Sequence, residues 1–149
     1  MIARKYEFTP RIELHGAAKH NGLANMITDL IAQNLADHPD KRRDFAHLVG
    51  RVAIVAEDAG VALTLQFSFG ALSVYDGIEG IPDVTVRASS DDVINLSLIE
   101  LTEDSRLPDL KGEVTKAMIK ASRAGRIRVL GAIWNIPMLI HLTRVMSVN

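Results

Sequence analysis

The stretch GRIRVLGAIWNIPMLIHLTRVM, residues 125–146, decides the fold of this chain. It opens on an alternating run, Arg126 to Leu130, in which Ile127 and Val129 point to one side and the arginines to the other. That alternation is typical of a β-strand with one buried face and one face in water. Gly131 ends the run. The pattern therefore predicts a strand, a glycine turn and a helix that form one unit.

The helix of this unit begins near Asn135 and is almost wholly apolar. Asn135 can cap it, and Pro137 is tolerated in the first turn, where backbone N–H groups have no partner within the helix. His141 and Arg144 are three residues apart, so they share one face and interrupt the apolar surface. We expect so apolar a helix to be covered on most sides, by the core of the protein or by a molecule that it holds.

The composition favours a single domain with an aliphatic interior. The chain has 149 residues, enough for a sizeable core. Its 17 Lys and Arg nearly balance its 18 Asp and Glu, which argues against a general nucleic-acid binder because such proteins usually carry a basic excess. Hydrophobic residues make up 48% of the chain and aromatic residues only 5%. Such an interior suits an adaptable cavity as well as an ordinary core.

The absence of cysteine removes disulfides, thiolate metal sites and thiol catalysis together. The opening residues, MIARKYEFTPRIEL, lack the continuous apolar segment of a signal peptide. The most apolar window, residues 127–142, is interrupted by charged and polar residues and is a poor membrane span. We therefore expect a soluble, cytoplasmic protein.

Upstream, residues 1–20 are expected to form an N-terminal arm or an extra strand through Lys5 to Phe8. Asn21 resembles a helix cap, and apolar residues then recur at helical spacing until His38-Pro39. A second short helix is expected from Asp40 to Leu48, with Phe45 and Leu48 inside and a charged, solvated face made of Lys41, Arg42, Arg43 and Asp44.

A three-stranded antiparallel meander is predicted next, because short runs rich in β-branched and aromatic residues alternate with glycine turns. The expected strands are Arg51 to Glu57, Val61 to Phe69 and Ala71 to Tyr75. On the middle strand one face is apolar and includes Phe67 and Phe69. A fourth strand, Asp83 to Ala88, and a helix capped by Ser89, Ser90 or Asp91 and reaching Leu101 follow. A polar stretch, residues 102–112, then leads to a helix over Glu113 to Arg123.

This order of elements resembles the sterol-carrier-protein type-two family of lipid-binding domains. Two local patterns carry the resemblance: PDVTV (82–86) followed by SSDDVINL (89–96), and AGRIRVLG (124–131) followed by the apolar positions of the final helix. The resemblance covers about residues 22–146 and implies one domain over 21–149. It also implies an α+β fold, in which a five-stranded, mainly antiparallel sheet carries helices on one face around an apolar tunnel for a sterol, an acyl chain or another lipid.

Candidate ligand-wall residues are bulky apolar side chains on the expected sheet face and helices. Such a wall needs few polar contacts, because each CH₂ removed from water contributes about 0.8 kcal/mol. Methionine suits it because its flexible side chain repacks around varied guests. The candidates are Phe67, Phe69, Leu98, Leu101, Met118, Trp134, Met138, Leu142 and Met146.

An enzyme would need polar groups that converge, and the sequence offers no recognised set. The histidines do not follow an H-E-x-x-H or other metal-ligand spacing, and neither a G-x-S-x-G nucleophile turn nor a phosphate-binding glycine loop occurs. His141 is expected at a wet surface, and the Asp91-Asp92 pair at a helix start. We therefore expect no catalysis, no cofactor and no metal.

Three functions stay open at this point. A lipid-binding or lipid-transfer protein would enclose a hydrophobic molecule and contact membranes transiently. A homodimeric interaction module would bury the same apolar surface between two subunits and have no cavity. An accessory carrier would present lipid intermediates to enzymes of isoprenoid-quinone assembly, as some members of the resembling family do.

Overall fold

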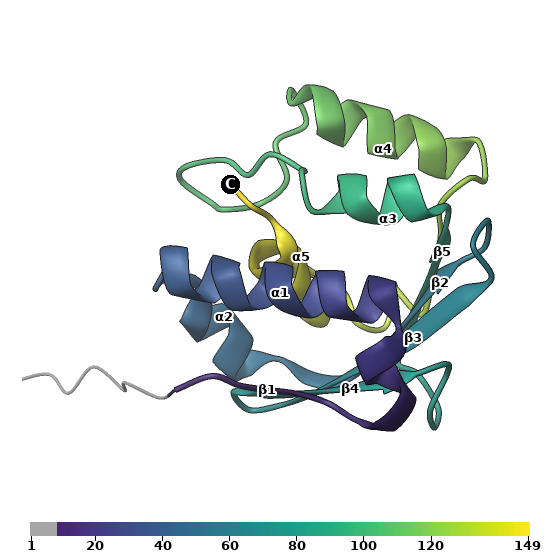
Figure 1. Ribbon diagram of the computed structural model, residues 1–149. Coiled ribbons are helices and arrows are strands. Elements are labelled where there is room, and N and C mark those ends of the chain that lie inside the picture. Colours follow the sequence, from purple (N-terminus) through teal and green to yellow (C-terminus); the bar gives the residue numbers. More distant parts are fainter. Residues whose placement is uncertain (1–8) are drawn as a thin grey trace, which may run out of the picture.

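A computed structural model describes residues 9–149, and six strands in this part of the chain form a single sheet (Figure 1). Their order across the sheet is β1-β4-β3-β2-β5-β6. The strands are β1 (Arg11–Leu14), β2 (Val49–Ala56), β3 (Val61–Ser68), β4 (Ala71–Asp76), β5 (Val84–Ala88) and β6 (Arg128–Leu130). The α-helices are α1 (Gly22–Asp37), α2 (Lys41–His47), α3 (Ser90–Leu96), α4 (Glu113–Arg123) and α5 (Ile136–Met146).

The mainly antiparallel α+β fold is confirmed, with one strand more than expected. β2, β3 and β4 form the predicted antiparallel meander, and β6 is antiparallel to β5. β5 runs parallel to β2, and β1 adds the extra strand at the β4 edge, in parallel register from Arg11 against Ala71. The strand expected through Lys5 to Phe8 lies outside the described residues.

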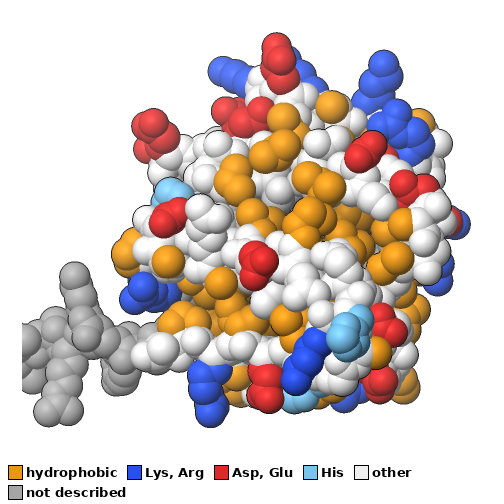
Figure 2. All heavy atoms as spheres, in the orientation of Figure 1, with side chains coloured by type: hydrophobic (Ala, Val, Ile, Leu, Met, Phe, Trp, Pro, Cys, Tyr) orange, Lys and Arg blue, Asp and Glu red, His pale blue; other side chains and the backbone are white. Residues whose placement is uncertain are grey.

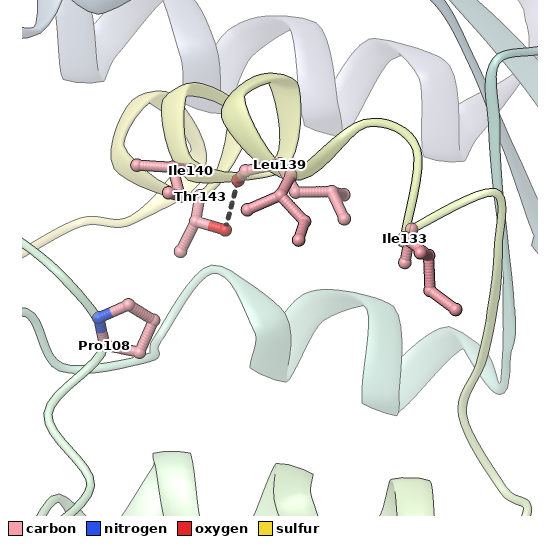
Figure 3. Close-up of a pocket in the computed structure, with 7 residues that line it drawn as sticks. Pro108, Ile133, Leu139, Ile140 and Thr143 are labelled. Atoms are coloured by element: carbon pink, nitrogen blue, oxygen red, sulfur yellow. Dashed lines mark hydrogen bonds between the residues drawn. The ribbon is translucent and has the colours of Figure 1, made fainter.

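The helices lie on one face of the sheet (Figure 1). α5 lies between α1 and α3, and α4 lies beyond α3 (Figures 1 and 3). The buried side chains of the sheet and helices form one hydrophobic core, centred on residues such as Val52, Leu65, Val84 and Ile31. The covered sheet face that the middle strand predicted is therefore present.

The helix starts follow the sequence closely. The Asn21 side chain accepts a hydrogen bond from the Ala24 N–H at 3.0 Å, which caps α1 as predicted. The Ser89 hydroxyl accepts one from the Asp92 N–H at 3.1 Å, and this caps α3. α1 ends before Pro39, because a proline disfavours helical backbone in the residue before it.

Phe67 and Phe69 do not share the buried face of β3. Phe67 is 2% exposed, whereas Phe69 is 78% exposed and lies beyond the end of the strand, in the turn to β4. There its φ is +41°, a left-handed conformation that breaks the alternation of the strand. Thr64, on the predicted polar face, is buried as well, because its hydroxyl donates to the Gly77 carbonyl at 2.7 Å and the following loop covers it.

Two predictions for the strand before α5 and for its cap are wrong. The strand begins only at Arg128, and Val129 is 39% exposed, because β6 is a short strand at the edge of the sheet. Asn135 does not cap α5 with its side chain, which instead donates to the carbonyl oxygens of Asp83 (3.1 Å) and Gly131 (2.9 Å). Gly131 is required here, since a Cβ on it would lie 2.1 Å from the Asp83 oxygen.

The expected charged, solvated face of α2 is also partly wrong. Lys41 is 2% exposed and Asp44 3% exposed. The Lys41 ammonium donates to the backbone carbonyls of Ser147 and, at 2.8 Å, of Asn149, so it holds the residues after α5. Burial lowers the pKa of Lys41 below its ordinary value. Helical spacing alone could not reveal these partners, because they lie about 100 residues further along the chain.

Candidate ligand-binding groove

α5 presents two apolar faces with different neighbours. Leu142, Val145 and Met146 are buried and join the core, and Met138 packs against its edge. The other face carries Ile136, Leu139, Ile140 and Thr143, whose spacing of three and four residues places them on one side of the helix. Only the first of these faces is fully covered by the protein.

The second face of α5 lines an open groove (Figure 3). Its volume is about 320 Å³. Pro108, from the segment between α3 and α4, stands opposite α5 at one end of it, and Ile133 lies toward the other end (Figure 3). The Thr143 hydroxyl donates to the Leu139 carbonyl at 2.7 Å. The lining is Pro108, Ala132, Ile133, Ile136, Leu139, Ile140 and Thr143, so it is almost entirely apolar.

None of the wall residues expected from the sequence lines this groove. Phe67, Met118, Leu142 and Met146 are core residues, and the ring of Phe67 meets Phe45 edge to face at 6.1 Å between centroids. Leu98 is 40% exposed, and Leu101 lies outside α3, which ends at Leu96 where Ser97 bonds back to the Ile94 carbonyl. Phe69 and Trp134 are exposed, and Met138 is partly buried.

Sequence reasoning therefore chose the correct helix and the wrong face of it. The stripe of Ile136, Leu139, Ile140 and Thr143 was a readable signal, because it repeats at helical spacing beside the core stripe. Nothing in the sequence ranks one apolar stripe above another. The expected enclosed tunnel is likewise replaced, among the described residues, by a groove that opens to solvent.

Large apolar side chains project around the Ile133 end of the groove. Leu130 is 56% exposed, Ile133 80%, Trp134 89% and Ile136 54%. We call these four residues the rim. The Asn135 hydrogen bonds to Asp83 and Gly131 anchor the backbone of the rim, so its exposed side chains stand on an ordered turn. Hydrophobic side chains also gather in the band between α1 and α3 (Figure 2).

A polar cluster lies near the Pro108 end of the groove. Asp44 of α2, whose side chain is 4% exposed, accepts from His141 at 2.8 Å, from Arg144 at 3.2 Å and from Arg106 at 2.7 Å. We call these four residues the Asp44 cluster. His141 also stacks on His47, with ring centroids 5.6 Å apart. The expected wet position of His141 is wrong, because its side chain is half-buried against the carboxylate.

The partners of Asp44 keep it ionised. Burial by itself raises the pKa of Asp44, but hydrogen bonds from His141 and Arg144 and the charge of Arg106 outweigh it, so the pKa lies below its ordinary value. Across residues 9–149, no group of three His, Cys, Asp or Glu side chains could hold a metal ion. The Asp44 cluster is thus a set of mutually paired charges.

Comparison with known proteins identifies the family. A model described as the SCP-2 sterol transfer family matches residues 27–122, which is more than half of the chain. The chain belongs to the SCP-2 sterol transfer family. The resemblance seen in the sequence is thereby confirmed, although the match ends before β6 and α5, which carry most of the groove.

Solved structures agree on the fold of this SCP-2 family member. A "UbiJ-SCP2 Ubiquinone synthesis protein" has a TM-score of 0.59 at 18% identity, covering 87% of this chain and 98% of its own. A sterol carrier protein 2 has a TM-score of 0.48 at 15% identity over 79% and 88% of the two chains. A Thermus thermophilus protein, titled a possible sterol carrier protein, has 0.42 at 15% identity over 80% and 85%. No curated protein sequence matches.

Membership of the SCP-2 family supports lipid binding or transfer as the general class of function. Within residues 9–149, no helix has the length and apolar character needed to cross a bilayer. The groove, the rim and the family therefore point to one kind of ligand, a hydrophobic molecule.

Glu100 ties the segment between α3 and α4 to the start of α4. Its carboxylate accepts from the N–H groups of Val114 and Thr115, both at 3.1 Å, and from the Thr115 hydroxyl at 3.0 Å. It thus caps α4, since Gly112 has no side chain to do so. Hydrogen bonds from its own backbone N–H and from Val114 and Thr115 lower the pKa of Glu100 to about 2.

The Glu100 cap makes the stability of the protein fall in acid. Because the pKa is about 2 in the folded chain and 4.5 ordinarily, ionised Glu100 stabilises the fold above pH 4.5, and this stabilisation is lost as the pH falls through about 2. We expect Glu100→Gln to lower stability at neutral pH and to flatten its decline in acid. Urea unfolding between neutral pH and pH 2 measures this. Glu103→Gln, at an exposed neighbour, should leave the decline as in the wild type.

Proposed function

We propose that this protein binds the hydrocarbon part of a lipid in the groove beside α5 and carries it without chemical change. The observation that carries the proposal is the open groove of about 320 Å³ with an almost wholly apolar lining, on a helix that is itself apolar. Each CH₂ group that enters it is removed from water at a gain of about 0.8 kcal/mol.

The size of the groove suits one hydrocarbon chain. Ligand pockets range over about 300–1,000 Å³, and this groove lies at the lower end. A fatty acyl chain or an isoprenoid chain therefore fits better than a bulky ring system. Aliphatic walls discriminate weakly between such chains, at about 1–3 kcal/mol per methylene, so we propose the class of ligand and not one compound.

The polar groups near the groove favour binding over catalysis. The lining carries one hydroxyl, Thr143, which already donates to the Leu139 carbonyl. Asp44 and its cationic partners are paired with one another. A general acid or base needs a group aimed at the bound molecule, and the groove presents none among its lining residues.

The rim is suited to transient contact with a membrane surface. Trp134 and Ile133 are almost fully exposed, and Ile133 and Ile136 belong to both the rim and the groove. Tryptophan is favoured at membrane interfaces because its ring is apolar with one polar N–H. Contact there would let a lipid enter the groove directly. We place this activity in the cytoplasm.

Two other functions remain candidates on specific observations. The exposed rim could instead be buried between two copies of the chain in a homodimer without a ligand. The similar structure titled as a ubiquinone synthesis protein suggests an accessory carrier of isoprenoid-quinone intermediates.

Native mass spectrometry of the freshly purified protein tests the proposal, followed by organic extraction of whatever is released. A stoichiometric lipid in a monomer supports the groove assignment, and its chemistry separates a quinone from an acyl chain or a sterol. An empty, tight dimer that also fails to take up a fluorescent fatty acid would replace the proposal with the interaction module.

A further inference from the structure

The segment between α3 and α4 contains a short hairpin that closes the Pro108 end of the groove. Leu101 pairs with Pro108 across it. The Thr102 N–H donates to the Leu107 carbonyl at 2.8 Å, and the Arg106 N–H donates to the Thr102 carbonyl at 3.0 Å. Residues 101–108 are therefore held together internally and can move as one body. We call them the 101–108 hairpin.

The base of the hairpin is fixed on both sides. Before it, the Ser97 carbonyl accepts from the Val148 N–H and the Ile99 carbonyl accepts from the Ser147 hydroxyl, both at 2.9 Å. After it, the Asp109 N–H donates to the Glu100 carbonyl at 2.7 Å. Glu100 in turn caps α4. These contacts would stay in place if only the tip moved.

The tip of the hairpin is held by charged groups. Arg106 pairs with Asp44 at 2.7 Å and with Asp40 at 3.3 Å. The Arg144 guanidinium donates to the carbonyls of Arg106 at 3.0 Å and Ser105 at 2.9 Å, and also to Asp44. Leu107, beside Arg106, is 39% exposed. Asp44 is thus the common anchor for both arginines that hold the tip.

The backbone of the tip is strained in this position. Arg106 has a φ of +54°, in the left-handed region that costs a residue with a side chain about 1–2 kcal/mol. Such a conformation persists when surrounding contacts impose it. Loss of those contacts would release the strain, which favours opening once the Asp44 cluster is broken.

We propose that the 101–108 hairpin is a gate at one end of the α5 groove, latched shut by the pairing of Arg106 and Arg144 with Asp44. This inference rests on the proposed function, because a gate has a role only if the groove takes up a ligand. Opening would remove Pro108 from the groove wall and widen the passage between α5 and the segment that follows α3. The latch then sets how fast a lipid enters and leaves, while the apolar lining sets how tightly it binds.

Spin labels test the latch without any ligand. The chain has no cysteine, so Gln33→Cys on α1 and Glu103→Cys on the hairpin, both at exposed positions, introduce a unique pair of labels. We expect a narrow distribution of distances between them, which becomes longer and broader when Asp44→Asn is added. Arg128→Gln on β6 breaks the exposed pair with Glu57, 2.8 Å away in the turn after β2, and should change nothing.

A second variant guards against loss of folding. Arg106→Gln removes the latch from the exposed side and leaves His141 and Arg144 to satisfy Asp44. If Asp44→Asn does not fold, Arg106→Gln decides the question by the same distance measurement. A folded latch variant whose distance distribution matches the wild type would overturn the latch.

Ligand exchange tests the gate. For a fluorescent fatty acid we expect the dissociation rate to rise about ten- to a hundredfold in the latch variants, the factor expected when hydrogen bonds to a charged group are lost. Unchanged exchange with a released hairpin overturns the gate alone. A wild-type protein that binds neither this probe nor a fluorescent isoprenoid quinone overturns the proposed function, and the gate with it.

Discussion

Replacing Phe67 by alanine is expected to lower the free energy of unfolding by about 3–5 kcal/mol, because the ring is deleted from a close-packed interior. Phe67 is 2% exposed and meets Phe45 edge to face. The surrounding strands pair on both sides of β3, so they cannot collapse into the space that the ring leaves. The melting temperature should fall by about 10 °C or more, measurable by calorimetry.

Phe69→Ala is the matched control for this prediction. It deletes the same side chain two residues further along, at a position that is 78% exposed, so its effect should stay within about 0.5 kcal/mol. Equal effects of the two substitutions would contradict the assignment of Phe67 to the core. A charged residue at Phe67 would consequently report on folding and not on lipid uptake.

Ile136→Asp is expected to reduce uptake of a fluorescent fatty acid by about a hundredfold or more, because a carboxylate on the groove wall must lose water when a hydrocarbon chain enters. Ile136 lines the groove and is 54% exposed, so the substitution removes little from the core. It is also the first residue of α5, whose first turn holds no acidic residue. A carboxylate there interacts favourably with the helix dipole, so the variant should fold.

Ile119→Asp provides the comparison on a different helix. Ile119 is 36% exposed on α4, which lies beyond α3 from the groove (Figure 3). Fluorescence titration should show wild-type affinity for this variant, while the melting temperatures of both variants report on folding. Full uptake by a folded Ile136→Asp protein would remove the groove as the binding site.

Much of the fold was predictable because it depends on neighbours in the chain. The caps at Asn21 and Ser89, the α4 bounds and the meander all follow from spacing and turn residues within a few positions. The family resemblance was predictable for the same reason, since it rests on short local patterns confirmed by the match over residues 27–122.

The site was predictable only as far as its helix. Periodicity marks α5 as apolar, but it carries at least two apolar stripes, and which one is left open depends on where α1, α2 and the α3–α4 segment pack. The alternation of β3 likewise continued through Phe69 in the sequence, whereas the chain reverses direction there. Local patterns contain no information about such partners.

The sequence by itself determined the secondary structure, the aliphatic character of the interior and the lipid-binding family, because each depends on residue type and short-range spacing. Only the tertiary structure decided which face of α5 lines a groove and which charged residues are buried. Asp44 meets Arg106, His141 and Arg144 across 62 to 100 positions of the chain. Burial and charge pairing at such separations are properties of packing, and packing is set by all the elements together.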